Sequence, residues 1–136
     1  MKKFAFIFFL VALSSASFAQ EKTHKIVFQL ATGDTLMHQG LTRQLNNVLK
    51  HWPSAQIEVV VHNAGLDFMH LENSSVKKEV PELQARGVVF AVCENTLRRK
   101  KVSKESIMAG AKFVPVGIAE IVEKQEEGFS YIKAGE

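Results

Sequence analysis

One stretch constrains the fold of this chain more than any other: the run from Gly87 to Thr96, which reads Gly-Val-Val-Phe-Ala-Val-Cys-Glu-Asn-Thr. An unbroken apolar run that begins after a glycine and ends in a polar cluster predicts a central strand buried on both faces. Such strands belong to parallel sheets, whose ligands bind at the carboxyl ends of the strands. The run places Cys93 at that end. Cys93 is the only cysteine in 136 residues, and a thiol is a strong nucleophile.

The remainder of the chain from residue 24 onward alternates between strand-like and helix-like segments. Segments rich in β-branched and aromatic residues predict strands, and apolar residues at spacings of three and four predict helices. The predicted strands are 24–31, 57–61, 87–93, 112–116 and 129–133, and the predicted helices are 35–52, 76–83, 104–109 and 118–125, with a basic turn or short helix at 97–101. This order predicts an α/β fold with a mostly parallel sheet and helices on both faces.

Local signals predict where several of these helices begin and end. Asp34 follows a turn and is the expected N-cap of the first long helix, which Pro53 terminates. Pro81 is expected to divide the helical segment at 76–83 in two, because proline interrupts a helix. Ser103 is the expected N-cap of a helix at 104–109 that ends at Gly110.

Residues 1–19 have the three parts of a secretory signal peptide: a basic start, an apolar core, and a small-x-small cleavage site that ends at Ala19. The apolar run is shorter than the roughly 20 residues that span a bilayer. We therefore expect cleavage after Ala19, a mature domain at 20–136 in the periplasm or secreted, and no membrane association after cleavage. Lys2 and Lys3 supply two of the 17 basic residues, against 14 acidic ones, so the mature chain is nearly neutral and no nucleic-acid binding is predicted.

Parallel strands bring their carboxyl ends to one rim, where the residues after the second and third strands should meet. Cys93 is the candidate nucleophile there, and His62 is a candidate for activating its thiol. The candidate binding residues nearby are Asn63, Asn95, Thr96, Arg98 and Arg99. Each feature has an ordinary structural alternative: Cys93 as a small buried hydrophobe, His62 as a strand-end histidine bonded to backbone, and 98–101 as a solvated face or a subunit contact.

Other chemistries have little support in the sequence. His24, His38, His51 and His70 show no H-x-H or H-E-x-x-H spacing, so no metal site is predicted. There is no glycine-rich nucleotide fingerprint, no G-x-S-x-G, and no C-x-x-C. A cysteine hydrolase remains open, although a chain of this size leaves little room for the oxyanion hole and substrate cleft that it needs.

Three separated motifs occur in order along the chain. They are Gly87-Val88-x-Phe90-x-x-Cys93-x-Asn95-Thr96, Val114-Pro115-x-Gly117-x-x-Glu120-Ile121 and Gln125-x-x-Gly128-Phe129-x-Tyr131-Ile132-Lys133. Together with the exit of the second strand, His62-Asn63-Ala64-Gly65, they resemble the DsrE/DsrF-like family, which includes YchN-like proteins. The resemblance extends over nearly the whole mature chain, from about residue 24 to residue 133.

The resemblance implies a three-layer α/β/α domain on a five-stranded, mostly parallel sheet, assembled as a homo-oligomer, either trimer or hexamer. Members with a cysteine at the place of Cys93 are similar to sulfur-relay proteins, in which that thiol accepts sulfur as a persulfide and passes it to a partner thiol. This exchange needs an accessible, partly ionised thiol, and the resemblance implies no metal or organic cofactor. The familiar sulfur-relay members are cytoplasmic, whereas this chain has a predicted export signal.

Two hypotheses of different class follow. The first is an exported persulfide carrier, similar to a sulfurtransferase, with Cys93 as the acceptor and with His62 and the nearby cations tuning its thiol. The second is a non-catalytic oligomeric binding or scaffold protein, in which Cys93 is structural. Whether the protein is an enzyme therefore depends on the reactivity of Cys93.

Overall fold

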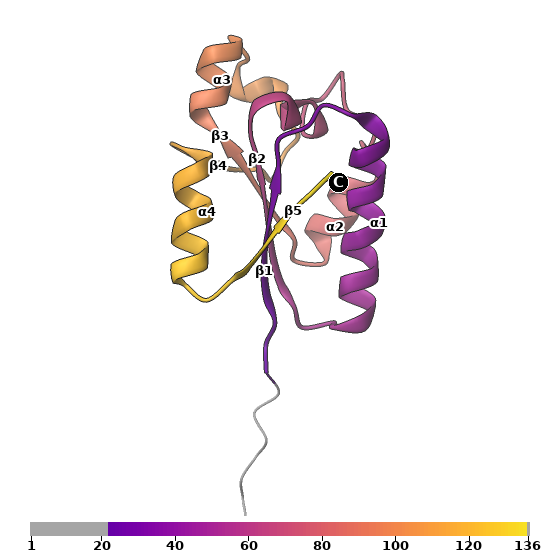
Figure 1. The fold of residues 1–136 in the computed structure, drawn as a ribbon. Helices are drawn as coiled ribbons and strands as arrows, with labels where there is room; N and C mark the ends of the chain where they lie inside the picture. The colour runs from indigo at the N-terminus through magenta and orange to yellow at the C-terminus, as the bar shows by residue number, and fades with distance from the viewer. Residues whose placement is uncertain (1–21, 136) are drawn as a thin grey trace, which may run out of the picture.

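The computed structural model of the chain describes residues 22–135, which form an α/β domain built around one sheet (Figure 1). In chain order the elements are β1 (Lys25–Leu30), α1 (Thr35–His51), β2 (Gln56–Val61), η1 (Asn63–Phe68), α2 (Glu79–Ala85), β3 (Val89–Cys93), α3 (Glu94–Lys100), η2 (Lys104–Ser106), β4 (Lys112–Val114), α4 (Gly117–Glu126) and β5 (Ser130–Lys133). The predicted signal peptide at 1–19, with its cleavage site, lies outside the described residues.

The five strands run in the order β4-β3-β2-β1-β5, and every pairing is parallel. Helices α1 and α2 cover one face of the sheet and α4 covers the other, while α3 lies over the carboxyl ends of the strands (Figure 1). The predicted three-layer α/β/α fold is therefore confirmed. The cysteine-bearing strand β3 is an interior strand, but β2 occupies the centre of the sheet.

The side chains of each strand alternate between the two faces of the sheet, so the sheet has a core on each face. The two cores differ in size. The larger core lies under α1 and α2 and includes Phe28, Leu45 and Phe90. The smaller core lies under α4 and contains Val27, Val60, Ala91, Val114 and Ile121. Residues that lie two or four positions from these valines or from Ala91 along the same strand therefore also face α4. This alternation determines which side chains at the carboxyl end of each strand point toward α4.

Helix α1 has the boundaries that its sequence signals predict. The Asp34 side chain accepts hydrogen bonds from the backbone N–H groups of Leu36 and Met37, at 2.8 and 3.3 Å. These bonds satisfy donors that the first turn of a helix otherwise leaves unpaired. At the other end, α1 stops at His51, two residues before Pro53.

Helix α2 differs from its prediction, because Pro81 does not divide it. The helix begins at Glu79, so Pro81 lies in its first turn, where a missing N–H breaks no helical hydrogen bond. Before the helix, the Ser74 hydroxyl accepts a hydrogen bond from the Val76 N–H at 3.1 Å and closes a turn.

The predicted helix at 104–109 is wrong. Only the short 3-10 turn η2 forms there, and Ser103 makes no side-chain cap bond to it. Ile107 instead pairs with His70 in an antiparallel bridge, and the Met108 N–H donates to the Met69 carbonyl at 2.9 Å. Because these contacts bury Ile107 and Met108 side by side in the larger core, tertiary packing overrides the local cap signal.

A buried charge cluster joins α4 to the sheet. Glu58 on β2 is 5% exposed and Glu120 on α4 is 8% exposed. Lys112 lies 3.4 Å from the Glu58 carboxylate and 2.6 Å from that of Glu120, and Lys124 lies 3.8 and 3.9 Å from the same two groups. Among the described residues, Glu58 Oε1 has no partner with hydrogen-bond geometry.

Burial raises the pKa of Glu58 to about 7, and the neighbouring Glu120 adds to this rise while Lys112 and Lys124 oppose it. Burial acts on Glu120 in the same direction, but hydrogen bonds from Lys112 and Glu58 outweigh it and lower the pKa of Glu120. Of the two carboxyl groups, Glu58 is therefore the one that takes up a proton first, and its protonation leaves α4 packed on the sheet over one carboxylate instead of two.

We predict that Glu58→Gln changes the pH dependence of stability. The folded-state pKa of Glu58 lies above its ordinary value of 4.5, so its stabilising effect is complete below about pH 4.5 and is lost as the pH rises through 7. Glutamine keeps the shape without the titration. Urea unfolding should show the free energy of unfolding of the parent, relative to the variant, falling by up to about 3 kcal/mol across this range. Glu123→Gln on the exposed side of α4 is the control, and a flat difference for Glu58→Gln would contradict the prediction.

Candidate functional site

A row of polar side chains crosses the sheet beneath α4, near the carboxyl ends of the strands. Cys93 and His62 lie two residues beyond Ala91 and Val60, which pack in the α4-side core, so strand alternation turns both toward α4. The register pairs Val61 with Val92, and Cys93 and His62 therefore follow neighbouring positions on β2 and β3. The sequence prediction that these two residues meet at one rim is consistent with this placement.

The start of α4 closes over the sulfur of Cys93. Cys93 is a free cysteine that is 5% exposed. The backbone N–H of Gly117, the first residue of α4, donates to Cys93 Sγ at 3.2 Å. A Cβ on Gly117 would lie 3.2 Å from Cys93 Cβ and 3.4 Å from His62 Cβ. The missing side chain of Gly117 thus allows the helix backbone to approach the thiol.

Several hydrogen-bond donors surround the thiol and offset its burial. Burial is the largest single influence and raises the pKa of the Cys93 thiol. Hydrogen bonds outweigh it: the Thr96 hydroxyl and the backbone N–H groups of Gly117, Thr96 and Asn95 hold the pKa of Cys93 below its ordinary value. These donors favour the thiolate, which is the nucleophilic form of cysteine.

The orientation of the Thr96 hydroxyl follows from a second contact. Thr96 Oγ1 accepts a hydrogen bond from the backbone N–H of Asn63 at 3.1 Å. A hydroxyl that accepts at oxygen keeps its hydrogen available to donate. Thr96, which is 3% exposed, therefore links the turn after β2 to the thiol at the end of β3.

His62 is buried and has a polar partner on β1. Its Nε2 lies 2.9 Å from Gln29 Nε2, and Gln29 Oε1 accepts a hydrogen bond from the Tyr131 hydroxyl on β5. Burial, and after it the Arg99 guanidinium, lower the pKa of His62. Since its Nε2 faces Gln29, that nitrogen is occupied, and the role of His62 in activating Cys93 stays a prediction.

The other predicted binding residues bond to one another around this rim. Arg99 donates to Asn63 Oδ1, and Arg98 donates to Asn95 Oδ1 at 3.4 Å. Asn63 has a positive φ of 52°, which asparagine tolerates better than most residues. The structure therefore brings the predicted polar residues together, but the Arg99–Asn63 bond holds the turn after β2 against α3, and the Arg98–Asn95 bond lies within α3. Ligand binding by them stays a prediction.

Glu94, directly after Cys93, bears on the thiol through its charge. An adjacent carboxylate disfavours a thiolate unless a cation compensates it. Lys104 forms an ion pair with the Glu94 carboxylate. This pair compensates the negative charge of Glu94 next to the thiol.

Three residues that complete the rim were not among the predicted site residues: Gly117, Gln29 and Tyr131. Gly117 and Tyr131 belong to the motifs quoted above, but nothing in the local sequence predicts that a backbone N–H or a hydroxyl is the relevant group. Gln29 is the one polar residue within β1 after Lys25. A polar side chain inside an apolar strand signals a buried hydrogen-bonding role, and this signal was available from the sequence.

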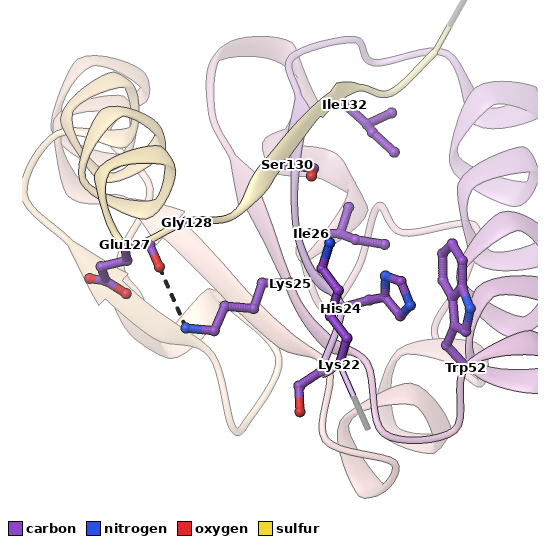
Figure 2. A pocket seen from close by; sticks show the side chains of 10 residues that line it. Lys22, His24, Lys25, Ile26, Trp52, Glu127, Gly128, Ser130 and Ile132 are labelled. Carbon is purple, nitrogen blue, oxygen red and sulfur yellow. Dashed lines mark hydrogen bonds between the residues drawn. The ribbon is translucent and has the colours of Figure 1, made fainter. Parts of the chain in front are cut away.

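Three cavities in the described part of the chain are lined by none of Cys93, His62, Thr96 and Gly117. One of about 470 Å³ lies at the amino ends of β1 and β5, where His24 stacks on Trp52 with ring centroids 3.9 Å apart and Lys25 reaches the Glu127 carbonyl (Figure 2). Another of about 540 Å³ lies at the amino ends of β2 and β3. A third of about 420 Å³ adjoins α3 and includes Glu94 and Lys104. Cavity volume therefore does not identify the site, and the thiol environment does.

The described residues contain neither a candidate metal-binding cluster nor a helix that could span a membrane. Across 22–135, no group of three or more histidine, cysteine, aspartate or glutamate side chains is arranged to hold a metal ion. In the same part of the chain, no helix combines the length and apolar character that crossing a membrane requires.

Comparison with known proteins supports the resemblance that the motifs carry. Residues 5–134 match the model of the DsrE/DsrF-like family. The chain belongs to this family. Among solved structures it is similar to MTH1491 from Methanobacterium thermoautotrophicum, described as a protein of unknown function, with 30% identity over 81% of this chain and 98% of that chain and a TM-score of 0.77. No curated protein matches significantly.

The role of Thr96 predicts a change in thiol reactivity. In Thr96→Val the hydroxyl donor is replaced by a methyl group of similar shape, so the pKa of the Cys93 thiol should rise. The pH dependence of iodoacetamide alkylation, followed by mass spectrometry on the folded protein, measures this shift. Thr96→Ser, which keeps the hydroxyl, is the matched control. An alkylation profile of Thr96→Val identical to that of the parent would contradict the assignment of Thr96 as a donor.

Gly117 leads to a second prediction. A methyl group there would meet Cys93, Val60 and His62 at 3.2–3.4 Å, so Gly117→Ala should displace the start of α4, lengthen the bond to Cys93 Sγ and raise the thiol pKa. The cost in unfolding free energy should be about 1–3 kcal/mol. Gly40→Ala is the control, because in α1 the added methyl has 3.8 Å of clearance to Arg43 and should stabilise by up to about 1 kcal/mol. Equal effects of the two substitutions would argue against close packing over the thiol.

Proposed function

We propose that this DsrE/DsrF-like protein is a sulfur carrier, in which Cys93 accepts sulfur as a persulfide and passes it to a partner thiol. The observation that carries the proposal is the hydrogen bond from the Gly117 N–H to Cys93 Sγ at 3.2 Å. Together with the Thr96 hydroxyl, this donor lowers the pKa of a thiol that burial alone would raise. A cysteine that only fills a core position needs no such donors, since a neutral thiol packs well among apolar groups.

The chemistry needs nothing beyond the thiolate and a donor of sulfane sulfur. Cys93 Sγ attacks the outer sulfur of thiosulfate, the bond between the two thiosulfate sulfurs breaks, and its electron pair leaves with sulfite. A partner thiolate then attacks the outer sulfur of the Cys93 persulfide, and Cys93 leaves as a thiolate. Both steps are displacements at sulfur, so the cycle has no net oxidation of the protein and needs no metal.

The surface next to the thiol supports transfer to another protein. Val116, Ile118 and Val122, at the start and on the outer side of α4, are 45–52% exposed. Val116 and Ile118 flank Gly117, the residue that closes over Cys93, and Val122 lies one turn beyond Ile118 along α4. Exposed apolar side chains in such a group are typical of contact surfaces. They offer a contact for a partner that brings its thiol to the start of α4, or for a second copy of the chain.

The proposal also includes export of the protein and its assembly into a homo-oligomer. A signal peptide at 1–19 would place the mature chain in the periplasm or outside the cell, and the family suggests a homo-oligomer, either trimer or hexamer. In an oxidising compartment, a carrier with one cysteine cannot inactivate itself by forming an internal disulfide.

The 5% exposure of Cys93 favours one alternative function. A non-catalytic binding or scaffold protein would keep the same fold and use Cys93 as a buried packing residue. The two functions differ in whether the folded protein reacts at this sulfur, and one experiment separates them.

The test is the intact mass of the folded mature protein after exposure to thiosulfate or polysulfide. We expect the parent to gain one sulfur atom that a reductant removes, and Cys93→Ser to gain none. Alkylation of the native parent should label Cys93 without denaturant.

If the parent gains no sulfur, and Cys93 resists alkylation until denaturant is added, the carrier function is excluded and the scaffold function is favoured. Thr96→Ser provides a matched variant that retains the hydroxyl donor, and it should gain sulfur as the parent does.

A further inference from the structure

The hydrogen-bonded chain Tyr131–Gln29–His62 lies beside the thiol. Its three members come from β5, β1 and the end of β2, which are neighbours in the sheet. Val27 pairs with Tyr131 and packs in the α4-side core, and Gln29 lies two residues after Val27. Tyr131, Gln29 and His62 therefore share the α4 side of the sheet with Cys93.

The Tyr131 hydroxyl defines the orientation of the Gln29 amide. It donates to Gln29 Oε1, so the oxygen of the amide is directed toward β5. The Gln29 NH₂ group then faces His62, with its nitrogen 2.9 Å from His62 Nε2. An amide NH₂ donates and cannot accept. For this contact to be a hydrogen bond, His62 Nε2 must accept and must carry no proton.

We propose that Gln29 and Tyr131 are positioning residues that hold His62 as the neutral tautomer with its proton on Nδ1. The tautomer of His62 follows from the two hydrogen bonds alone. Only the role of His62 in sulfur transfer rests on the proposed function. His62 then brings a hydrogen-bond donor to the rim rather than a base. The thiolate of Cys93 depends on the donors Thr96 and Gly117, and in this proposal His62 Nδ1–H is the group that would donate to the sulfur donor or to the persulfide.

The groups around His62 favour this neutral form. Arg99 of α3 lies near enough to disfavour a positive charge on the ring, and burial acts in the same direction. Cys93 of β3 and Tyr131 of β5 also face this side of the sheet, as does Lys133 of β5, which pairs with Gln29. Farther from the carboxyl ends of the strands, the same side holds the charge cluster of Glu58, Glu120, Lys112 and Lys124. A doubly protonated ring would also lose the bond from the Gln29 NH₂ group, because neither imidazolium nitrogen accepts.

The protein contains its own reference for the opposite tautomer. His38 Nε2 lies 2.8 Å from the backbone carbonyl of Thr32, and a carbonyl can only accept. His38 must therefore carry its proton on Nε2. The two histidines should give opposite patterns in the same spectrum.

The test is a long-range ¹H–¹⁵N correlation spectrum of the imidazole rings in the mature protein, recorded without any sulfur donor. The unprotonated ring nitrogen resonates far downfield of the protonated one. We expect Nε2 to be the downfield nitrogen in His62 and Nδ1 to be the downfield nitrogen in His38. A His62 pattern that matches that of His38 would overturn the proposal, because the Gln29 amide would then have the reverse orientation. His62→Gln identifies the signals.

Two variants test the positioning residues. Tyr131→Phe removes the hydroxyl at a side chain that is 41% exposed, so the fold should persist while the Gln29 amide can reverse. The His62 signals should shift toward the Nε2–H pattern. Gln29→Glu places an acceptor opposite Nε2, so the ring should become an imidazolium and the pKa of His62 should rise. Unchanged His62 signals in both variants would count against the proposal.

A functional readout separates this inference from the carrier function. In Gln29→Glu, the nearby imidazolium should lower the pH at which Cys93 becomes alkylated, and the parent profile should show titration of the thiol alone. A purely structural role for Gln29 would leave this profile unchanged.

If the tautomer is as proposed but Cys93 gains no sulfur in the mass measurement, the carrier function fails and the tautomer assignment stands. If sulfur is gained but the tautomer is reversed, only the positioning proposal fails.

Discussion

The contact between the first N–H of α4 and the sulfur of Cys93 is the interaction around which the rim is arranged. It joins the end of β3 to a helix that begins 24 residues later in the chain, and it forms because Gly117 has no side chain to separate the two backbones. The same close approach places the start of α4 over His62. The position of α4 thus controls both how far the thiol is buried and how well its anion is stabilised.

That position has an electrostatic cost elsewhere in the helix. One turn after Gly117, Glu120 meets Glu58 in the smaller core, and two lysines compensate a pair of carboxylates that water would otherwise solvate. A proton held at Glu58 reduces this cost. Because α4 is one rigid element, the protonation of Glu58 and the hydrogen bond to Cys93, which lie about one turn apart along it, both depend on how α4 packs against β2 and β3. Stability and thiol chemistry are therefore linked through a single helix.

The sequence was sufficient for the parts of this arrangement that depend on local pattern. Apolar runs and helical periodicity predicted the five strands and α1, and parallel topology predicted that Cys93 and His62 share a rim. It was not sufficient where the outcome depends on partners far away in the chain. The cap signal at Ser103 predicted a helix, but Ile107 pairs with His70 instead. The donors to the thiol include a backbone N–H of Gly117, and backbone groups leave no signature in residue type.

The burial of Cys93 and the stabilisation of its thiolate have to be considered together, because they would act on different steps of the proposed sulfur transfer. Hydrogen bonds from Thr96 and Gly117 increase the fraction of thiolate at a given pH, whereas 5% exposure limits how often a reagent reaches the sulfur. A small anion with a terminal sulfur needs only a narrow opening beside the start of α4, but a protein thiol needs a wider one. For the proposed carrier, the low exposure of Cys93 therefore favours loading by a small sulfur donor over unloading, and we expect unloading to require a partner that displaces the start of α4 as it binds.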